Sequence, residues 1–310
     1  GVSHPRTPVG YLSREDEDLG FGPFLLLALM EGLVSAAVLA LTAVGLSLVF
    51  GVMRVVNVAH GAFFMMGAVV AWFVAGHVPG PPVLGWIAAL LAAPLVVGAL
   101  AALVDVSVLK RLDYEPEAVI VATIGVLYML EQTALLTFGP DARPVAAPFE
   151  LRLQLPWFGY SGYKLFVVLA AAAVLAGVWA LMQRSRFGLI MRATQVDRTT
   201  ARAFGINVDR VYAGTFALGA GLAAVAAVLV VPISQVHYLM GGDPLLLAFI
   251  TVIVGGLGSL RGTLMAALLI GLSDGVISMF WSPTLSKIIA TLLVALVLVF
   301  RPQGLFGARA

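Results

Sequence analysis

The feature that most constrains this chain is a succession of nine long apolar runs with polar connections between them. A helix needs about 20 apolar residues to cross a hydrocarbon core of roughly 30 Å, and most of the runs meet or approach this length. They are Phe24–Phe50, Gly61–Ala75, Val83–Leu109, Ala118–Phe138, Tyr163–Met182, Val211–Val231, Leu245–Leu257, Thr263–Trp281 and Leu285–Phe300. A soluble fold could not hide so many apolar segments, so we expect lipid to surround the chain.

Composition agrees with a membrane protein and narrows the possible chemistry. Apolar residues make up 61% of the chain and charged residues 11%, against about 45–50% and about 25% in an average soluble domain. The absence of cysteine excludes disulfides and thiolate metal sites. The sequence predicts an all-α, polytopic integral membrane helical bundle with about eight to ten helical segments.

Two of the runs, Gly61–Ala75 and Leu245–Leu257, are shorter than a full crossing requires. They adjoin glycine-rich turns, Asn57–Gly61 and Gly255–Gly262. Irregular backbone is tolerated at membrane depth only where it is buried in protein or lines a cavity. We therefore expect some helices to be broken or re-entrant. The two glycine-rich breaks, each followed by a helix of small residues, also hint at an internal repeat.

One polar segment, Ser185–Tyr212, interrupts the apolar pattern. Counting the preceding Arg184, six arginines face only Asp197 and Asp209, which gives a net charge of +4. Basic connections face the cytoplasm in membrane proteins. The other basic connections hold Arg54, Lys110 with Arg111, and Arg301.

Nine crossings place all these basic connections on one side. The N-terminus is then outside, the C-terminus is cytoplasmic, and the loop Gly139–Gly162 is outside. We expect an extracytoplasmic tail (1–22), a transmembrane domain (23–300) with a cytoplasmic segment (184–210), and a cytoplasmic tail (301–310). The chain would be a multi-pass protein of a bacterial cytoplasmic (inner) membrane.

The basic segment has the signature of two helices. Arg192–Phe204 is predicted to form a short helix that Gly205 ends. Ala201 and Gly205, four residues apart, would leave a smooth, shallow surface. Asn207 or Asp209 could then cap the next helix. The length of the segment and this signature favour a docking element over an ordinary solvated loop.

Several polar residues lie in or beside the apolar runs. Asn57, His60 and Gly61 would line a solute path or hold a bent backbone beside it; alternatively, they would cap a helix end at the cytoplasmic interface. Each of four acidic residues would cost about 2.5–3.5 kcal/mol at a lipid-exposed centre. They are Glu31, Asp105, Glu131 and Asp274. Glu131 and Asp274 lie deeper in their runs, so we expect them to face the interior, on a solute path or as bundle-stabilising bonds.

No motif for enzymatic chemistry is visible. The sequence lacks a G-x-x-x-x-G-K-[ST] phosphate loop, a G-x-S-x-G elbow and an H-E-x-x-H zinc motif. Nothing pairs a nucleophile with a base. We therefore expect a protein that is not an enzyme, with no metal site and no cofactor of its own, and with no nucleic-acid partner.

Several short motifs, in order and spread over nearly the whole chain, resemble the permeases of ABC importers for branched-chain amino acids, the Leu/Ile/Val type. The resemblance runs from about Glu31 to Gly307. It is carried by TAVGLSLVFGVMRVVNVAHG (Thr42–Gly61), ATIG (Ala122–Gly125), SRFG (Ser185–Gly188), ARAFGINVDRV (Ala201–Val211), VIVGGLGSLRG (Val252–Gly262) and RPQGLFG (Arg301–Gly307).

The resemblance implies alternating access in a helical permease that pairs with a second permease, either a homologous chain or another copy of itself. Two cytoplasmic ABC ATPases would bind the ATP and Mg, and an extracytoplasmic solute-binding protein would deliver the solute. It implies that Ala201–Asp209 belongs to a coupling loop for an ATPase. Our candidate coupling residues are Arg192, Arg198, Ala201, Arg202, Phe204, Gly205, Ile206 and Asp209. Our candidate substrate-pathway residues are Asn57, His60, Gly61, Glu131, Gln132 and Asp274.

The chain departs from the family pattern at Glu131-Gln132, where the family usually has two amides. Relatives of this family also carry urea and short amides, so a urea or short-amide ABC permease is a second hypothesis. A third is a stand-alone channel or secondary carrier for a small neutral solute, and a fourth is a membrane scaffold without transport.

Overall fold

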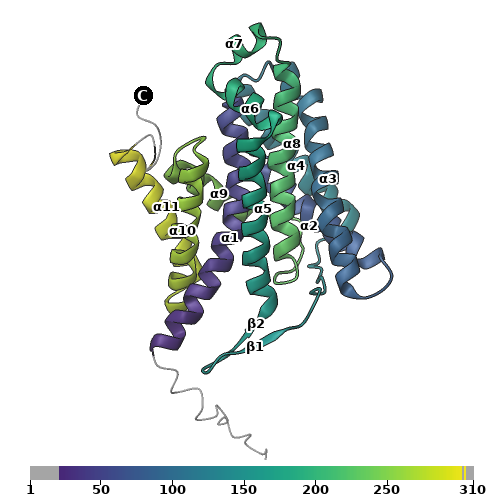
Figure 1. Cartoon of the computed structure of the whole chain (residues 1–310). Coiled ribbons are helices and arrows are strands. Elements are labelled where there is room, and N and C mark those ends of the chain that lie inside the picture. Colours follow the sequence, from purple (N-terminus) through teal and green to yellow (C-terminus); the bar gives the residue numbers. More distant parts are fainter. Residues whose placement is uncertain (1–20, 302–303, 305–310) are drawn as a thin grey trace, which may run out of the picture.

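Each of the nine apolar runs forms a helix, because a segment in lipid must satisfy its backbone hydrogen bonds internally. The computed structural model (Figure 1) describes residues 21–301 and Gly304. The helices of the nine runs are α1 Phe21–Met53, α2 His60–His77, α3 Pro82–Ser107, α4 Pro116–Phe138, α5 Gly162–Arg184, α8 Val208–Val230, α9 Gly242–Gly255, α10 Leu260–Phe280 and α11 Pro283–Phe300. All except α9, which has 14 residues, are long and apolar enough to cross a membrane.

The remaining elements lie in the polar connections. They are the 3-10 helix η1 Leu109–Leu112, the short helices α6 Arg186–Val196 and α7 Arg198–Ala203, and a small antiparallel hairpin of β1 Arg152–Gln154 and β2 Gly159–Ser161. The prediction of an all-α polytopic bundle is confirmed. The described residues hold eleven α-helices, because the basic segment adds α6 and α7. The predicted tails fall almost entirely outside the described residues, and α1 already begins at Phe21.

Successive segments cross the bundle in alternating directions, so the connections gather at two ends (Figure 1). One end, at the top of Figure 1, carries α6, α7 and the C-terminal end of α11. The 3-10 helix η1 lies at the same end, since its Lys110 pairs with Asp209 at the start of α8. We call it the basic face, since it holds the connections with Arg54, Lys110, Arg111, the 184–210 segment and Arg301. The opposite face carries the start of α1 and the β1–β2 hairpin. The prediction that the strongly basic connections share one side agrees with this arrangement.

The helices approach one another closely at small residues. An added Cβ at Gly45 of α1 would lie 2.5 Å from the carbonyl oxygen of Gly219 in α8. Gly98 of α3 lies against Ala217 of α8, and Gly32 of α1 lies against Leu272 of α10. In lipid no hydrophobic force drives helices together, so close contact between small residues must hold the bundle.

The packing has an internal two-fold pattern that relates α1–α4 to α8–α11. Helix α1 packs on α10 as α8 packs on α3, and α1 contacts α9 as α8 contacts α2. The pairs α2–α4 and α9–α11 correspond in the same way. Because α1 and α8 run in opposite directions, the two halves are inverted, as in many transporters.

The structure thus contains an internal repeat, as the sequence hinted, but the two glycine-rich motifs are not its equivalent parts. Irregular backbone precedes both short helices: residues 54–59 lead into α2 and residues 231–241 lead into α9. These two stretches are equivalent in the inverted pattern. The other glycine-rich motif, Gly255–Gly262, holds only a tight turn between α9 and α10, beside Gly51 near the end of α1. The break expected there lies instead at the start of α9.

Candidate functional site

The predicted cluster at Asn57, His60 and Gly61 lies where residues 54–59 enter α2. His60 is fully buried, and its Nε2–H donates to the carbonyl oxygen of Thr42 at 2.9 Å. Asn57 is also buried, and the N–H of Val58 donates to Thr123 Oγ1 of α4 at 3.2 Å. Thr42 lies eleven residues before the end of α1, so the cluster is deep in the bundle. This position contradicts the interpretation of the cluster as a helix cap at the membrane interface.

The start of α2 meets the start of α9 at this depth. An added Cβ at Gly61 would lie 2.5 Å from the carbonyl oxygen of Gly241, the residue before α9. Each helix N-terminus carries roughly half a positive charge, so two positive ends face one another. Asn57 Oδ1 and His60 Nδ1 have no hydrogen-bond partner in the described part of the chain. The α2–α9 junction therefore combines close backbone contact with two buried acceptor atoms that have no partner among the described residues.

The other predicted pathway residues lie elsewhere. Glu131 is buried on α4, whereas the neighbouring Gln132 is exposed. Asp274 of α10 accepts hydrogen bonds from Ser278 Oγ at 3.2 Å and from Ser286 Oγ at 2.7 Å. Among the described residues, no hydrogen bond or ion pair joins Glu131, Gln132 or Asp274 to the α2–α9 junction. The described residues also contain no group of three or more His, Asp or Glu placed to hold a metal ion.

The basic segment folds as two helices that meet at Asp197. The carboxylate of Asp197 accepts from the N–H of Thr199 at 2.8 Å and of Thr200 at 3.2 Å, and it also bonds the Thr200 hydroxyl. It thus caps α7, as an aspartate commonly does. The predicted single helix Arg192–Phe204 is therefore wrong: the cap ends α6 at Val196 and starts α7 at Arg198.

The end of α7 matches the sequence prediction. Gly205 has a φ of +81°, a left-handed conformation that glycine adopts without strain. Its N–H donates to the carbonyl of Arg202 at 2.9 Å, and the N–H of Ile206 donates to that of Ala201 at 3.1 Å. Asn207 then caps α8 by accepting from the N–H of Arg210 at 3.1 Å. The predicted helix end at Gly205 is confirmed, and of the two residues predicted as possible caps, Asn207 and Asp209, the structure has Asn207.

The segment presents a mixed surface at the basic face. Phe204 is 83% exposed and Val196 is 81% exposed, while Arg198 and Arg202 are also exposed. Ala201 is only 4% exposed, so the smooth surface expected from Ala201 and Gly205 is wrong. The α7 helix is seated on Ala201 and turns Phe204 outward.

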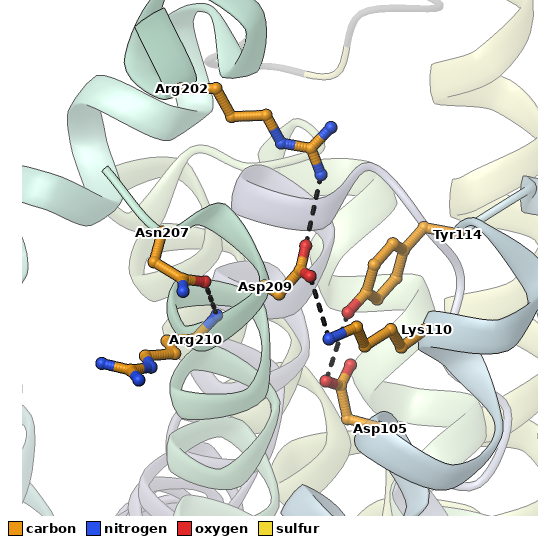
Figure 2. A network of polar contacts seen from close by, with 7 residues as sticks. All are labelled: Asp105, Lys110, Tyr114, Arg202, Asn207, Asp209 and Arg210. Atoms are coloured by element: carbon orange, nitrogen blue, oxygen red, sulfur yellow. Dashed lines mark hydrogen bonds and ion pairs between the residues drawn. The ribbon is translucent and has the colours of Figure 1, made fainter. Parts of the chain in front are cut away.

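Asp209 ties α7 to the connection between α3 and α4 (Figure 2). Its Oδ1 bonds Arg202 Nη2 at 3.2 Å, and its Oδ2 lies 3.1 Å from Lys110 Nζ of η1. The side chains are partly exposed, so each pair contributes at most about 1 kcal/mol. The bridge sets the position of the segment more than it stabilises the fold.

A second contact lies beneath the bridge, where Tyr114 donates to Asp105 Oδ2 at 3.3 Å (Figure 2). Asp105 is fully buried, and its Oδ1 has no partner in the described part of the chain. The ring of Tyr114 also packs edge-on against Tyr212 of α8 at 4.6 Å between centroids. Burial, together with the Asp105 carboxylate, raises the pKa of Tyr114 well above its usual range, so the phenol stays protonated and donates.

Two further bonds connect the segment to the remaining turns of the basic face. Arg54 Nη2 donates to the carbonyl of Gln195 at 3.4 Å, and Gln195 Nε2 donates to that of Gly258 at 3.5 Å. Arg54 stands at the start of the 54–59 stretch, and Gly258 lies in the turn between α9 and α10. The segment therefore touches the connections that lead to α2, to α4 and away from α9.

Strained backbone is concentrated at the same place. Arg54, Asp113 and Tyr114 adopt φ values of 58°, 50° and 56°, in the left-handed region that non-glycine residues rarely occupy. All three line a hollow of about 360 Å³ between the basic segment and the bundle. Such strain persists only where surrounding structure enforces it, and it is typical of functional sites. The sequence offered no signal for Lys110, Tyr114 or Gln195 in these contacts, beyond the basic character of Lys110.

The chain is similar to known transport permeases over nearly its full length. Residues 28–298 match the family described as "Branched-chain amino acid transport system / permease component". The high-affinity branched-chain amino acid transport system permease protein LivH of Escherichia coli (strain K12) is 28% identical over 92% of this chain and 96% of its own length.

Two further relatives have similar names. BraD of Pseudomonas aeruginosa, a high-affinity branched-chain amino acid transport system permease protein, is 28% identical over 90% of this chain and 94% of its own length. A probable branched-chain amino acid transport permease protein LivH of Methanocaldococcus jannaschii is 26% identical over 90% of this chain and 92% of its own. No solved structure matches the chain.

Proposed function

Because the chain belongs to the permease family of branched-chain amino acid transport systems, we propose that it is the membrane-spanning subunit of an ABC importer. Its solute would be a branched-chain or closely related amino acid. The observation that carries the proposal is the match of the family to residues 28–298, which includes the basic segment and all or most of each of the nine apolar helices. The members of the family are transport subunits rather than enzymes, and the names of the relatives favour amino acids over urea or short amides.

We assign the basic face to the cytoplasm of a bacterial cell, because positive connections accumulate there. The first described helix then begins outside, and the chain leaves α11 on the cytoplasmic side. A soluble ATPase can reach α6 and α7, where Phe204 offers an apolar anchor among exposed arginines. Arg192, Arg198, Arg202, Gly205, Ile206 and Asp209 shape or surround this surface, and Ala201 seats it from below.

The bonds of the basic segment suggest how an ATPase could drive the bundle. A displacement of α6 would pull on Arg54 and, through Gln195, on the turn at Gly258. The first contact leads along residues 54–59 to Asn57 and His60, and the second leads along α9 to its start. Both routes end at the α2–α9 junction, which would separate or close as the solute path changes its open side.

The remaining partners follow from the ABC type of importer. A second permease, of the same or a homologous chain, would complete the path. Two ATPases would bind the ATP and Mg, and a solute-binding protein would deliver the amino acid from outside. Within the path, Glu131, Gln132 and Asp274 would contact the solute or stabilise the helices beside it.

Uptake and ATPase capture together test the proposal. Cells that express the native transporter should take up radiolabelled L-leucine, and an antibody against this chain should co-purify an ATPase from detergent-solubilised membranes. Gly205→Asp and Arg202→Glu should abolish uptake and ATPase capture while the amount of chain in the membrane stays normal. A chain whose uptake continues after ATP depletion would be a channel or secondary carrier, and a chain without any solute flux would be a scaffold; either result contradicts the proposal.

A further inference from the structure

A cavity of about 250 Å³ lies between α1, α8, α9 and α10. Val38, Leu247 and Ile270 form part of its apolar wall, and Glu31, Asp243 and Asp274 are its acidic residues. Since one water accounts for roughly 30 Å³ of liquid, a volume of about 250 Å³ corresponds to about eight waters, which is room for a small organic solute. Small-molecule sites combine such an apolar lining with a few polar groups.

The charges around the cavity are only partly balanced. Lys164 Nζ lies 2.6 Å from Glu31 Oε1, and Lys287 Nζ lies 2.6 Å from Asp243 Oδ2. Asp274 bonds only two serine hydroxyls, at 2.7 Å and 3.2 Å, and none of the ion pairs in the described structure includes it. Asp274 is therefore the one lining carboxylate whose negative charge no basic side chain balances in the described part of the chain.

An ionisable residue within a membrane-spanning helix is costly to place in lipid, and such residues mark solute or ion pathways. The two serine bonds hold the Asp274 carboxylate in one orientation, because Ser286 is buried at the start of α11 and Ser278 lies one turn further along α10. A ligand that brings a positive charge would complete the balance. The apolar wall requires that the rest of this ligand be apolar.

We propose that the cavity is a solute site for an amino acid with a branched apolar side chain, whose ammonium group pairs with Asp274. Lys164 and Lys287 already pair with the other two lining carboxylates, Glu31 and Asp243, so Asp274 is left for the ammonium group of the solute. The assignment rests on the proposed transport function and adds the position and chemistry of the site.

The location of the cavity suits a step in transport. Thr42 also lines it, and the carbonyl of Thr42 accepts the hydrogen bond from His60. Asp243 and Pro244, in the first turn of α9, line it as well. A solute in the cavity therefore contacts the first turn of α9 directly and the start of α2 only through Thr42 of α1, which links its arrival to the α2–α9 junction.

The absence of cysteine permits a direct test. Ser35→Cys places one thiol on the cavity wall, and Ala146→Cys places one on the exposed loop of the opposite face. The rate of labelling by a membrane-impermeant maleimide is measured in native cells with and without L-leucine. Labelling of Ser35→Cys should slow about tenfold at ten times the half-protecting leucine concentration, because only unoccupied sites react. Labelling of Ala146→Cys should not change.

The role of Asp274 is tested in the same assay. 4-Methylpentanoate, which has the leucine side chain and carboxylate without the ammonium group, should give no protection. Asp274→Asn should raise the half-protecting leucine concentration at least about tenfold, since one charge of the pair is lost. An unchanged labelling rate without leucine shows that this variant is folded, and Ser286→Ala should weaken protection less.

Three results would overturn the site: Ser35→Cys that the reagent cannot label, labelling that leucine does not slow, or equal protection by 4-methylpentanoate. Leucine uptake by the native chain is measured in parallel. Uptake without protection would overturn this site and leave the proposed function standing. Protection without uptake would support the site and contradict the transport function.

Discussion

At the scale of single residues, the basic face is organised by bonds of unequal strength. Asp209 joins Arg202 and Lys110 through partly exposed ion pairs, whereas Tyr114 donates to one oxygen of a fully buried carboxylate, Asp105. Exposed pairs contribute little, but a buried polar group without a partner is costly. The bond of Tyr114 should therefore matter more for stability, and the bridge at Asp209 more for position.

A pair of substitutions separates these roles. Tyr114→Phe should lower the free energy of unfolding by about 1–3 kcal/mol, because it leaves Asp105 with no donor. Lys110→Ala should lower it by about 0.2–1 kcal/mol. Denaturant unfolding of the purified chain measures both. Tyr212→Phe is the matched control, since no hydrogen bond of its hydroxyl occurs among the described residues, and a loss as large as that of Tyr114→Phe would contradict the account.

The cap at Asp197 makes α7 sensitive to acid. The Thr200 hydroxyl, followed by the N–H groups of Thr200 and Thr199, holds the pKa of Asp197 below its usual value. The stabilisation of α7 is therefore present above the ordinary aspartate pKa of about 3.9, and it is lost as the pH falls through the lower, folded value. Protection factors from hydrogen exchange in α7 should drop within that window.

Asp197→Asn is the control for this prediction. Asparagine caps helices about as well as aspartate and does not titrate, so α7 should keep its protection across the same pH range. Asp197→Ala should lose the protection at every pH. An equal acid response of the native chain and Asp197→Asn would show that another group is responsible.

The sequence predicted which residues form the basic segment, but not the cap and the side-chain contacts that hold them in place. Asp197 was visible only as a countercharge, because nothing in one sequence tells a cap from a solvated aspartate inside a helix-forming stretch. The partners of Asp209 and Gln195, namely Lys110 and Gly258, lie far from them along the chain. Such contacts depend on how the helices pack, and no local pattern predicts them.

At the scale of elements, the important feature is the meeting of α2 and α9. Each helix starts after irregular backbone, and the two starts touch at Gly61 and Gly241. The sequence predicted the break before α2, since the run Gly61–Ala75 is too short for a full crossing and adjoins the turn Asn57–Gly61. It missed the break before α9, because residues 231–241 lie beyond an ordinary span end and resemble a surface loop. The second break was predicted instead at the glycine-rich motif after α9, Gly255–Gly262.

Two alanine substitutions on α2 test the junction. Gly61→Ala should destabilise the chain by about 1–3 kcal/mol and impair leucine uptake, because its Cβ would collide with the carbonyl of Gly241. Gly76→Ala meets nothing within 4 Å, so it should leave uptake intact and stability unchanged or slightly raised. Thermal unfolding and uptake are measured for both. Equal behaviour of the two variants would mean that the starts of α2 and α9 are not in close contact.

At the scale of the whole molecule, two inverted halves meet at one central region. The α1–α8 crossing at Gly45 and Gly219 and the α2–α9 junction both lie where the halves meet. The number of apolar runs and the distribution of charge were sufficient to predict the helices and a common basic face. Inversion could not be read from the sequence, because the equivalent stretches, 54–59 and 231–241, share no motif.

We propose that the basic segment receives the ATPase on the cytoplasmic side. In the cysteine-free chain, Phe204→Cys carries a benzophenone photo-crosslinker at the most exposed apolar residue of that segment, and Trp157→Cys carries it on the β1–β2 hairpin of the opposite face. Illumination of native membranes should join the ATPase subunit to position 204 and not to position 157. A product with the ATPase at position 157, or labelling of position 204 by an impermeant maleimide outside intact cells, would contradict the account.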